Sequence, residues 1–246
     1  MHYVMSDIHG QYTRYLRMLD KIGLTESDIL YVLGDCIDRG PNPVDTLTDV
    51  LDRKNAVMLM GNHEEMMLKT YRDPFAKALW YRNGAATTEA QLSGFGKFKK
   101  YRLMKKIEAL PLVIPDLTVN GKTFYLAHAS HAAEYLTGTV RYSNADDDTR
   151  HRILWSREYI NAAKGNVMSF CLSEQYKELY ALYPKDTVLI CGHTPVQKCA
   201  YGKTDKNGNG RITRTMGGHL INMDCGCAMG KQLGCLRLED MQEYYC

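Results

Sequence analysis

The chain lacks any long apolar run and any large excess of one charge. None of its hydrophobic stretches reaches the about 20 residues that a membrane-spanning helix needs. Its first residues show no basic start followed by a long apolar region, as a signal peptide would. Lys plus Arg number 31 and Asp plus Glu 28, so the net charge is only +3. We therefore expect a cytoplasmic protein with no membrane contact and no nucleic-acid partner.

The eight cysteines also lack the spacing of a structural zinc site. Cys225 and Cys227 form a C-x-C pair, but a zinc ribbon needs two C-x-x-C-like knuckles. In a cytoplasmic protein we expect free thiols rather than a disulfide framework. Cys36, which follows Asp35, is expected to pack in the protein interior, with redox sensitivity as the alternative.

What is present is a globular composition, with 45% hydrophobic and 24% charged residues in 246. Apolar runs at 2–5, 29–33 and 56–60 alternate with helical patterns at 12–22 and from Pro43 onward, which predicts a parallel sheet with right-handed crossovers. We interpret residues 1–246 as one α/β domain with a mostly helical insertion at about 64–109. The second half favours strands at 117–120, 122–127, 187–191, 197–201, 220–223 and 232–238, and a short helix after Ser173.

Polar side chains follow five of the apolar runs, at the point where each predicted strand ends. They are Asp7 and His9, then Asp35, Asp38 and Arg39, then Asn62 and His63, and finally His128 and His193. Ligands of open α/β sheets bind beyond the carboxyl ends of the strands, so these side chains are expected to converge. A mixed nitrogen and oxygen set without thiolate favours manganese, iron or zinc. The set is too large for one ion, which favours two divalent cations sharing Asp35. Such a pair stabilises both oxygens of an in-line phosphoryl displacement.

The motifs Ser6–Gly10, Gly34–Gly40, Gly61–Glu64, His128-Ala129 and Gly192–Pro195 resemble those of PPP-type serine/threonine phosphatases. These enzymes belong to the calcineurin-like metallophosphoesterase superfamily, and the likeness is greatest to the short phage and bacterial branch. The resemblance implies a two-sheet α/β/β/α sandwich. It implies that Asp7, His9 and Asp35 hold one metal, and that Asp35, Asn62, His128 and His193 hold the other. It also implies that His63 is the general acid and that Asp38 pairs with His63 and favours its charged form. The resemblance further implies that phosphate is bound by Arg39, Arg157 and Asn62. It implies a supporting role for Asp224.

The implied activity is hydrolysis of phosphoserine or phosphothreonine, and also phosphotyrosine, in a phosphorylated protein or peptide, by direct attack of a metal-bound hydroxide. We expect Mn²⁺, with iron or zinc as alternatives. A second reading is a symmetrical diadenosine tetraphosphate hydrolase or another nucleotide phosphoesterase. That group tends to have Ala in place of Asp38 and Asp in place of Glu64, so this sequence favours the phosphatase. A non-catalytic binding module, and a nucleic-acid phosphodiesterase using the basic run 97–106, are further alternatives.

Overall fold

Two β-sheets packed face to face form the centre of the computed structural model, which describes residues 1–131, 138, 140–157, 186–199 and 201–246. The first sheet has the order β13-β12-β1-β2-β3. Its strands β1 (His2–Met5), β2 (Ile29–Val32) and β3 (Ala56–Met58) are parallel. The strands β12 (Gly234–Arg237) and β13 (Glu243–Tyr245) extend it in antiparallel fashion beyond β1. The predicted parallel sheet is thus confirmed for the first three strands.

The second sheet has the order β10-β11-β7-β5-β4-β6. These strands are β10 (Thr213–Thr215), β11 (Leu220–Asn222), β7 (Thr187–Cys191), β5 (Lys122–Ala127), β4 (Pro111–Val119) and β6 (Val140–Arg141). The strand β7 runs parallel to both β5 and β11. The predicted β4–β5 hairpin turns at Asn120 and Gly121, whose φ angles of 48° and 76° give the tight turn that matches strand twist. A separate hairpin pairs β8 (Lys203–Thr204) with β9 (Gly210–Arg211).

The alternation of side chains along each strand builds the core between the sheets. Val4 of the first sheet and Phe124, Leu126 and Ile190 of the second belong to one buried cluster, which also holds Tyr31, Leu33, Leu59, Ile221, Met223 and Leu236. The residues between them in sequence, such as Tyr125 and Leu189, belong to a second cluster with the helices. Each sheet is therefore apolar on both faces.

Helices cover the outer faces. The helices α1 (Tyr12–Ile22) and α2 (Pro43–Asp52) pack on the first sheet through buried residues such as Tyr15 and Leu47. Gly23 ends α1 in the left-handed conformation, and Pro43 occupies the first turn of α2. The helix α7 (Asp147–Trp155) contributes Ile153 and Leu154 to the same cluster as Tyr125 of the second sheet. These layers form the expected two-sheet α/β/β/α sandwich.

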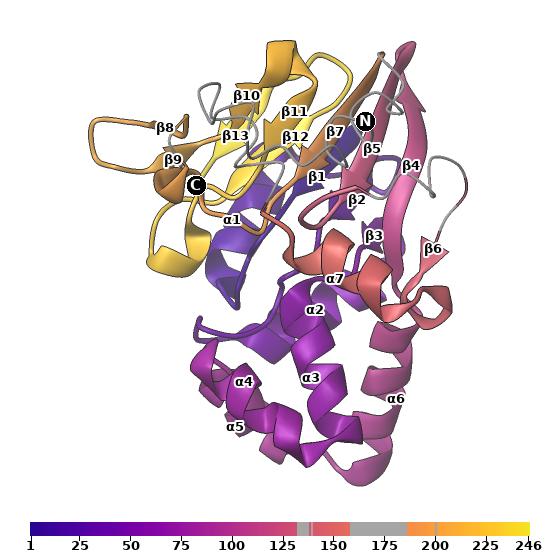
Figure 1. Ribbon diagram of the computed structural model, residues 1–246. Helices are drawn as coiled ribbons and strands as arrows, with labels where there is room; N and C mark the ends of the chain where they lie inside the picture. Colours follow the sequence, from indigo (N-terminus) through magenta and orange to yellow (C-terminus); the bar gives the residue numbers. More distant parts are fainter. Residues whose placement is uncertain (132–137, 139, 158–185, 200) are drawn as a thin grey trace.

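A helical lobe fills the interval between β3 and β4 and lies below the sheets in Figure 1. It contains α3 (Asn62–Arg72), η1 (Pro74–Ala76), α4 (Lys77–Arg82), α5 (Ala86–Ser93) and α6 (Lys97–Glu108). The interval is helical as predicted. The division of the chain into a single domain stays a prediction.

One predicted strand is wrong. Residues 196–198 form the short helix η3 (Val196–Lys198), because Val196 donates to the carbonyl of Asp224 and then accepts from the N–H of Cys199. The helix expected after Ser173 lies outside the described residues. The other short helices among the described residues are η2 (Tyr142–Asn144), η4 (Met216–Gly218) and η5 (Cys227–Met229). The seven described cysteines are free thiols, and no described helix has the length and apolar character to cross a bilayer.

Candidate dinuclear metal site

Five chain segments meet where parallel strands of both sheets end. The segments after β1, β2 and β3 come from the first sheet, and those after β5 and β7 come from the second. They deliver Asp7, His9, Asp35, Asp38, Arg39, Asn62, His63, His128 and His193, and all of these except Arg39 are buried. The convergence expected from the sequence is therefore present.

The backbone of these segments is unusual. Nine non-glycine residues of the described chain have positive φ, and six of them belong to the predicted site: Asp7, His9, Asp35, Asp38, Arg39 and His193. Non-glycine residues enter this region at a cost of about 1–3 kcal/mol each, and such residues cluster at functional sites. Hydrogen bonds between segments hold the turns, such as His9 N–H to the carbonyl of Asp35 at 2.9 Å.

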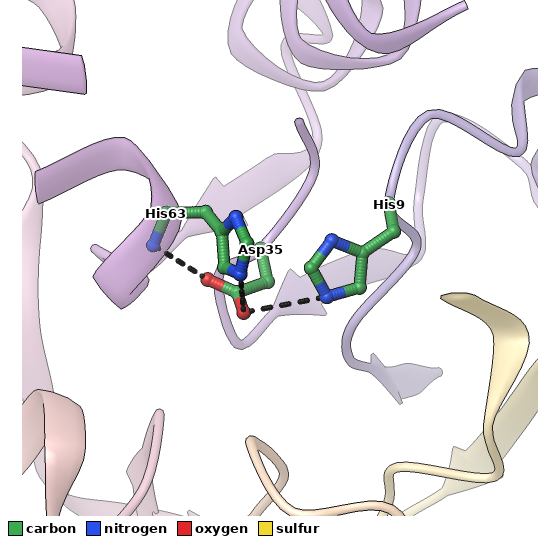
Figure 2. A group of neighbouring side chains, drawn as sticks. All are labelled: His9, Asp35 and His63. Atoms are coloured by element: carbon green, nitrogen blue, oxygen red, sulfur yellow. Dashed lines mark hydrogen bonds and ion pairs between the residues drawn. The ribbon is translucent and has the colours of Figure 1, made fainter. Parts of the chain in front are cut away.

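Two groups of side chains place their nitrogen and oxygen atoms within 4.8 Å of one another. The first is His9, Asp35 and His63, shown in Figure 2, and the second is Asp35, His128 and His193. One oxygen of Asp35 lies 3.5 Å from Nε2 of His9, and its other oxygen lies 3.5 Å from Nε2 of His128. Asp35 is thus the residue common to both groups, as two cations sharing one carboxylate would require.

The hydrogen-bond partners of His128 are those expected if a cation fits between these groups. Nδ1 of His128 lies 2.7 Å from the carbonyl of Leu33 and must donate to it, which leaves a lone pair on Nε2. That lone pair faces the amide oxygen of Asn62 at 2.9 Å and a carboxylate oxygen of Asp35. Nδ1 of His9 likewise donates to the carbonyl of Ile37, which leaves a lone pair on Nε2, but this nitrogen faces the guanidinium of Arg39 as well as Asp35. Acceptors that converge without a proton between them are the ligand set of a metal ion.

Burial shifts the pKa of the site histidines and the pKa of Asp35 in opposite directions. It lowers the pKa of His9, His63 and His193 well below the usual range, and also lowers the pKa of His128. A lowered pKa favours the neutral imidazole, which is the form in which His9, His128 and His193 would bind a metal. Burial, with the charges of Asp7 and Glu64, raises the pKa of Asp35 well above its usual range.

Asn62 and Asp7 occupy the rest of the candidate ligand positions. The amide oxygen of Asn62 lies 2.9 Å from His128 Nε2 and 3.1 Å from His193 Nδ1. Asp7 belongs to neither three-residue group. Its carboxylate instead accepts from the backbone N–H of His193 at 3.0 Å and from the Ser6 hydroxyl at 2.5 Å. Within the described residues, Nε2 of His193 is buried and has no hydrogen-bond partner, so it also remains available to a cation.

The expected contact between Asp38 and His63 is present, with Oδ2 of Asp38 2.5 Å from Nδ1 of His63. Asp38 also accepts from Trp80 Nε1 at 2.8 Å and from the Thr88 hydroxyl at 2.5 Å. Burial raises the pKa of Asp38 to about 7, although the two donors oppose this. Burial and the charge of Arg39 lower the pKa of His63. This direction is opposite to the one expected from Asp38 alone.

Arg39 reaches both histidines of the first group. Its two terminal nitrogens lie 3.1 Å from Nε2 of His9 and 2.9 Å from Nε2 of His63. Arg157 follows α7 and is exposed, and its charge contributes to the lowered pKa of His193, so it lies near the second group. Asp224 is buried and accepts from the N–H of Gly226, and burial and the charge of Asp7 raise its pKa.

Sequence reasoning missed three residues that hold the site together. Trp80 and Thr88 come from the helical lobe, and no local pattern connects them with Asp38. The sequence gives Glu64 a bearing on substrate class and no indication of its structural role. Its buried carboxylate accepts from the N–H groups of Asp35, Cys36, Ile37 and Gly61 at 2.9–3.3 Å. It therefore braces the turn that carries Asp35.

Cys36 is buried, with its sulfur 3.9 Å from that of Met58. Burial and the charges of Glu64, Asp35 and Asp7 raise the pKa of its thiol well above the usual range. The interior packing expected for Cys36 is present, and an elevated thiol pKa disfavours the redox alternative.

The sandwich, the shared edge of its sheets and the two His/Asp groups define a metallophosphoesterase, a hydrolase of phosphate esters. The profile of the calcineurin-like phosphoesterase family matches residues 3–204. The chain belongs to this family.

Relatives with two different named activities align with the chain. A bis(5'-nucleosyl)-tetraphosphatase PrpE (asymmetrical) of Anoxybacillus flavithermus is 26% identical over 97% of this chain and 91% of its own length. Serine/threonine-protein phosphatase 1 of Salmonella typhimurium is 28% identical over 67% of this chain and 72% of its own length. A solved serine/threonine phosphatase of Saccharomyces cerevisiae shares the fold, with a TM-score of 0.59 at 14% identity, over 100% of this chain and 78% of that one.

Proposed function

We propose that the chain is a metal-dependent phosphomonoesterase that removes phosphate from phosphoserine or phosphothreonine in a protein or peptide. The observation that carries this proposal is the buried Asp38–His63 pair at 2.5 Å, next to the guanidinium of Arg39. An alkoxide is a poor leaving group and must be protonated as it departs. A hydrolase of phosphate monoesters therefore has a use for such a pair, whereas a nucleotide is a better leaving group and needs it less.

Each residue has a defined task in this proposal. Asp7, His9 and Asp35 would hold one divalent cation, and Asp35, Asn62, His128 and His193 would hold the other, with Mn²⁺ as the expected metal. When bound, the two cations activate the attacking water and neutralise charge on the phosphoryl oxygens. His63 delivers a proton from Nε2 to the leaving oxygen while Asp38 fixes its other nitrogen. Arg39, with Arg157 and Asn62, binds the phosphoryl oxygens through charge-assisted hydrogen bonds.

The second candidate activity is cleavage of bis(5'-nucleosyl) tetraphosphates. It is supported by the near full-length alignment with the PrpE tetraphosphatase, since the alignment with the phosphatase from Salmonella covers only two thirds of the chain. The same metal ligands and the same Arg39 would serve this reaction. The two candidates differ in the leaving group and hence in the demand on His63.

Initial rates on a phosphothreonine peptide and on diadenosine tetraphosphate, each with Mn²⁺ supplied, distinguish the candidates. His63→Asn, which keeps a side chain of similar polarity but cannot act as the acid, is the matched variant. We expect the peptide to be turned over faster, and His63→Asn to lose about 100-fold or more on the peptide. Faster turnover of the dinucleotide, with little effect of His63→Asn, would show that the proposed substrate is wrong.

A further inference from the structure

We propose that Trp80, Thr88 and the Asn83–Gly84 backbone of the helical lobe position the Asp38–His63 pair and Arg39. This inference rests on the proposed function, because it assigns the lobe a role in the same acid step. Trp80 and Thr88 form hydrogen bonds to Asp38 and are positioning residues. They act through Asp38 and not on the substrate.

The first observation is that the lobe fixes both the backbone and the carboxylate of Asp38. The Thr88 hydroxyl accepts from the N–H of Asp38 at 3.0 Å and donates to its Oδ1 at 2.5 Å. This short ring holds a residue whose φ is 68°, a conformation that aspartate rarely adopts. Thr88 thus stabilises the turn and sets the rotation of the carboxylate together.

The second observation concerns the oxygen that faces the acid. Trp80 Nε1 donates to Oδ2 of Asp38 at 2.8 Å, and the same oxygen lies 2.5 Å from Nδ1 of His63. Trp80 and Asp38 are almost completely buried, so no solvent competes for these bonds. With one oxygen tied to Thr88 and the other to Trp80, the carboxylate presents a single orientation to His63.

The third observation is that the same segment holds Arg39. The N–H of Arg39 donates to the carbonyl of Gly84 at 3.0 Å, and its Nε donates to the carbonyl of Asn83 at 3.3 Å. Gly84 has a φ of 103°, and a Cβ atom there would lie 2.8 Å from Cγ of Arg39. The close approach requires glycine at this position. The lobe therefore orients two neighbouring groups of the site through one loop.

Trp80→Phe and Thr88→Val test the effect on the acid step, because each keeps most of the side-chain volume. The first removes the donor to Oδ2 of Asp38, and the second removes the hydroxyl that bonds Oδ1 and the N–H of Asp38. Thr87→Val is the matched control, since the Thr87 hydroxyl is buried without a partner in the described residues. Each test variant should lower kcat on the phosphothreonine peptide about tenfold with little change in KM, as expected for a lost hydrogen bond to a charged group. The loss on 4-nitrophenyl phosphate should be smaller, because nitrophenolate leaves with less need of a proton. Thr87→Val should behave as wild type.

A double-mutant cycle separates positioning from general damage to the fold. If Trp80 acts through the acid, Trp80→Phe should have almost no further effect in a His63→Asn background. Equal losses on both phosphate esters that persist in that background would overturn the inference. The inference would also be overturned if Trp80→Phe and Thr88→Val kept the wild-type kcat while His63→Asn lost most of its kcat.

The contact of Arg39 with Asn83 and Gly84 is tested by the binding of inorganic phosphate rather than by turnover. Gly84→Ala should weaken competitive inhibition by inorganic phosphate about tenfold, because Arg39 is displaced. Gly94→Ala is the control, since a Cβ there meets nothing nearer than 3.7 Å. Unchanged inhibition in Gly84→Ala would refute this part. If the enzyme cleaves only diadenosine tetraphosphate, the proposed substrate is wrong, and the double-mutant cycle with His63→Asn is repeated on that substrate. A loss of kcat in Trp80→Phe that disappears in the His63→Asn background then supports the positioning role. A loss that is additive with that of His63→Asn overturns it.

Discussion

Replacing Asp35 by asparagine should stabilise the metal-free protein and destroy its response to metal. Asparagine has the same shape as aspartate and keeps an acceptor for the N–H of His63, which lies 3.1 Å from Oδ1 of Asp35. It removes a carboxylate that is only 2% exposed and lies among the charges of Asp7 and Glu64. Without cations, that charge has no adequate partner, and its removal is favourable.

The two effects have opposite signs and different sizes. Burying one unpaired ion costs several kcal/mol, of which we expect Asp35→Asn to recover about 1–3 kcal/mol of unfolding free energy. Metal at 100 times its dissociation constant adds about 2.7 kcal/mol per site, so two sites add about 5 kcal/mol to the wild type. Because Asp35 belongs to both ligand groups, the variant should gain less than about 1 kcal/mol from the same metal.

Urea unfolding with chelator and with Mn²⁺ measures both effects. Because burial raises the pKa of Asp35, the metal-free wild type loses stability as pH rises above the ordinary aspartate value of 3.8. The advantage of Asp35→Asn should therefore be present at about pH 7.5 and absent at about pH 4. Asp116→Asn, at an exposed position of β4, is the control and should change neither quantity. A metal-free Asp35→Asn that is less stable than wild type, or one that keeps the full metal increment, would refute this reasoning.

Three further changes test other parts of the site and fold. Arg39→Ala should retain both metals by elemental analysis but lose about 3–4 kcal/mol of transition-state stabilisation in kcat/KM, and a parallel loss of metal would show that Arg39 is misplaced. Gly192→Ala would put a Cβ 2.1 Å from Asp7 Oδ2 and 2.2 Å from the Ser6 hydroxyl, so we expect about 1–3 kcal/mol of destabilisation in urea and reduced metal content. Ile190→Ala, in the core between the sheets, should cost about 2–5 kcal/mol in urea with the metal content of the folded protein unchanged.

The meeting of the candidate metal ligands at one edge could be predicted, because it depends on the order and direction of the strands rather than on individual side-chain contacts. Apolar runs before Asp7, Asp35 and His193 indicate strands, and parallel strands bring their carboxyl ends to one edge. The order of the first three strands and their crossovers then follow from general rules. Candidate metal ligands were therefore recognisable before any side chain was placed.

The details that position these residues leave no such signal. Asp38, with its positive φ, is held by hydrogen bonds to Thr88, which is 50 residues away in sequence. Nothing in the sequence around Trp80 indicates that its indole N–H donates to Asp38. The predicted strand at 197–201 failed for the same reason, since a tertiary hydrogen bond from Val196 to Asp224 accompanies a short helix at 196–198.

Glu64 has a structural role that its place in a sequence motif does not indicate. From the sequence, glutamate rather than aspartate at this position favoured a phosphatase over a dinucleotide hydrolase. In the structure its carboxylate contacts backbone N–H groups around Asp35 and Gly61 and none of the residues that would bind substrate. Glu64→Asp shortens the side chain by one methylene, so at least one of these bonds should be lost, at about 1–3 kcal/mol of stability. We expect weaker metal binding but an unchanged ratio of peptide to dinucleotide turnover. A shift of that ratio by about tenfold or more would show that Glu64 contributes to substrate choice after all.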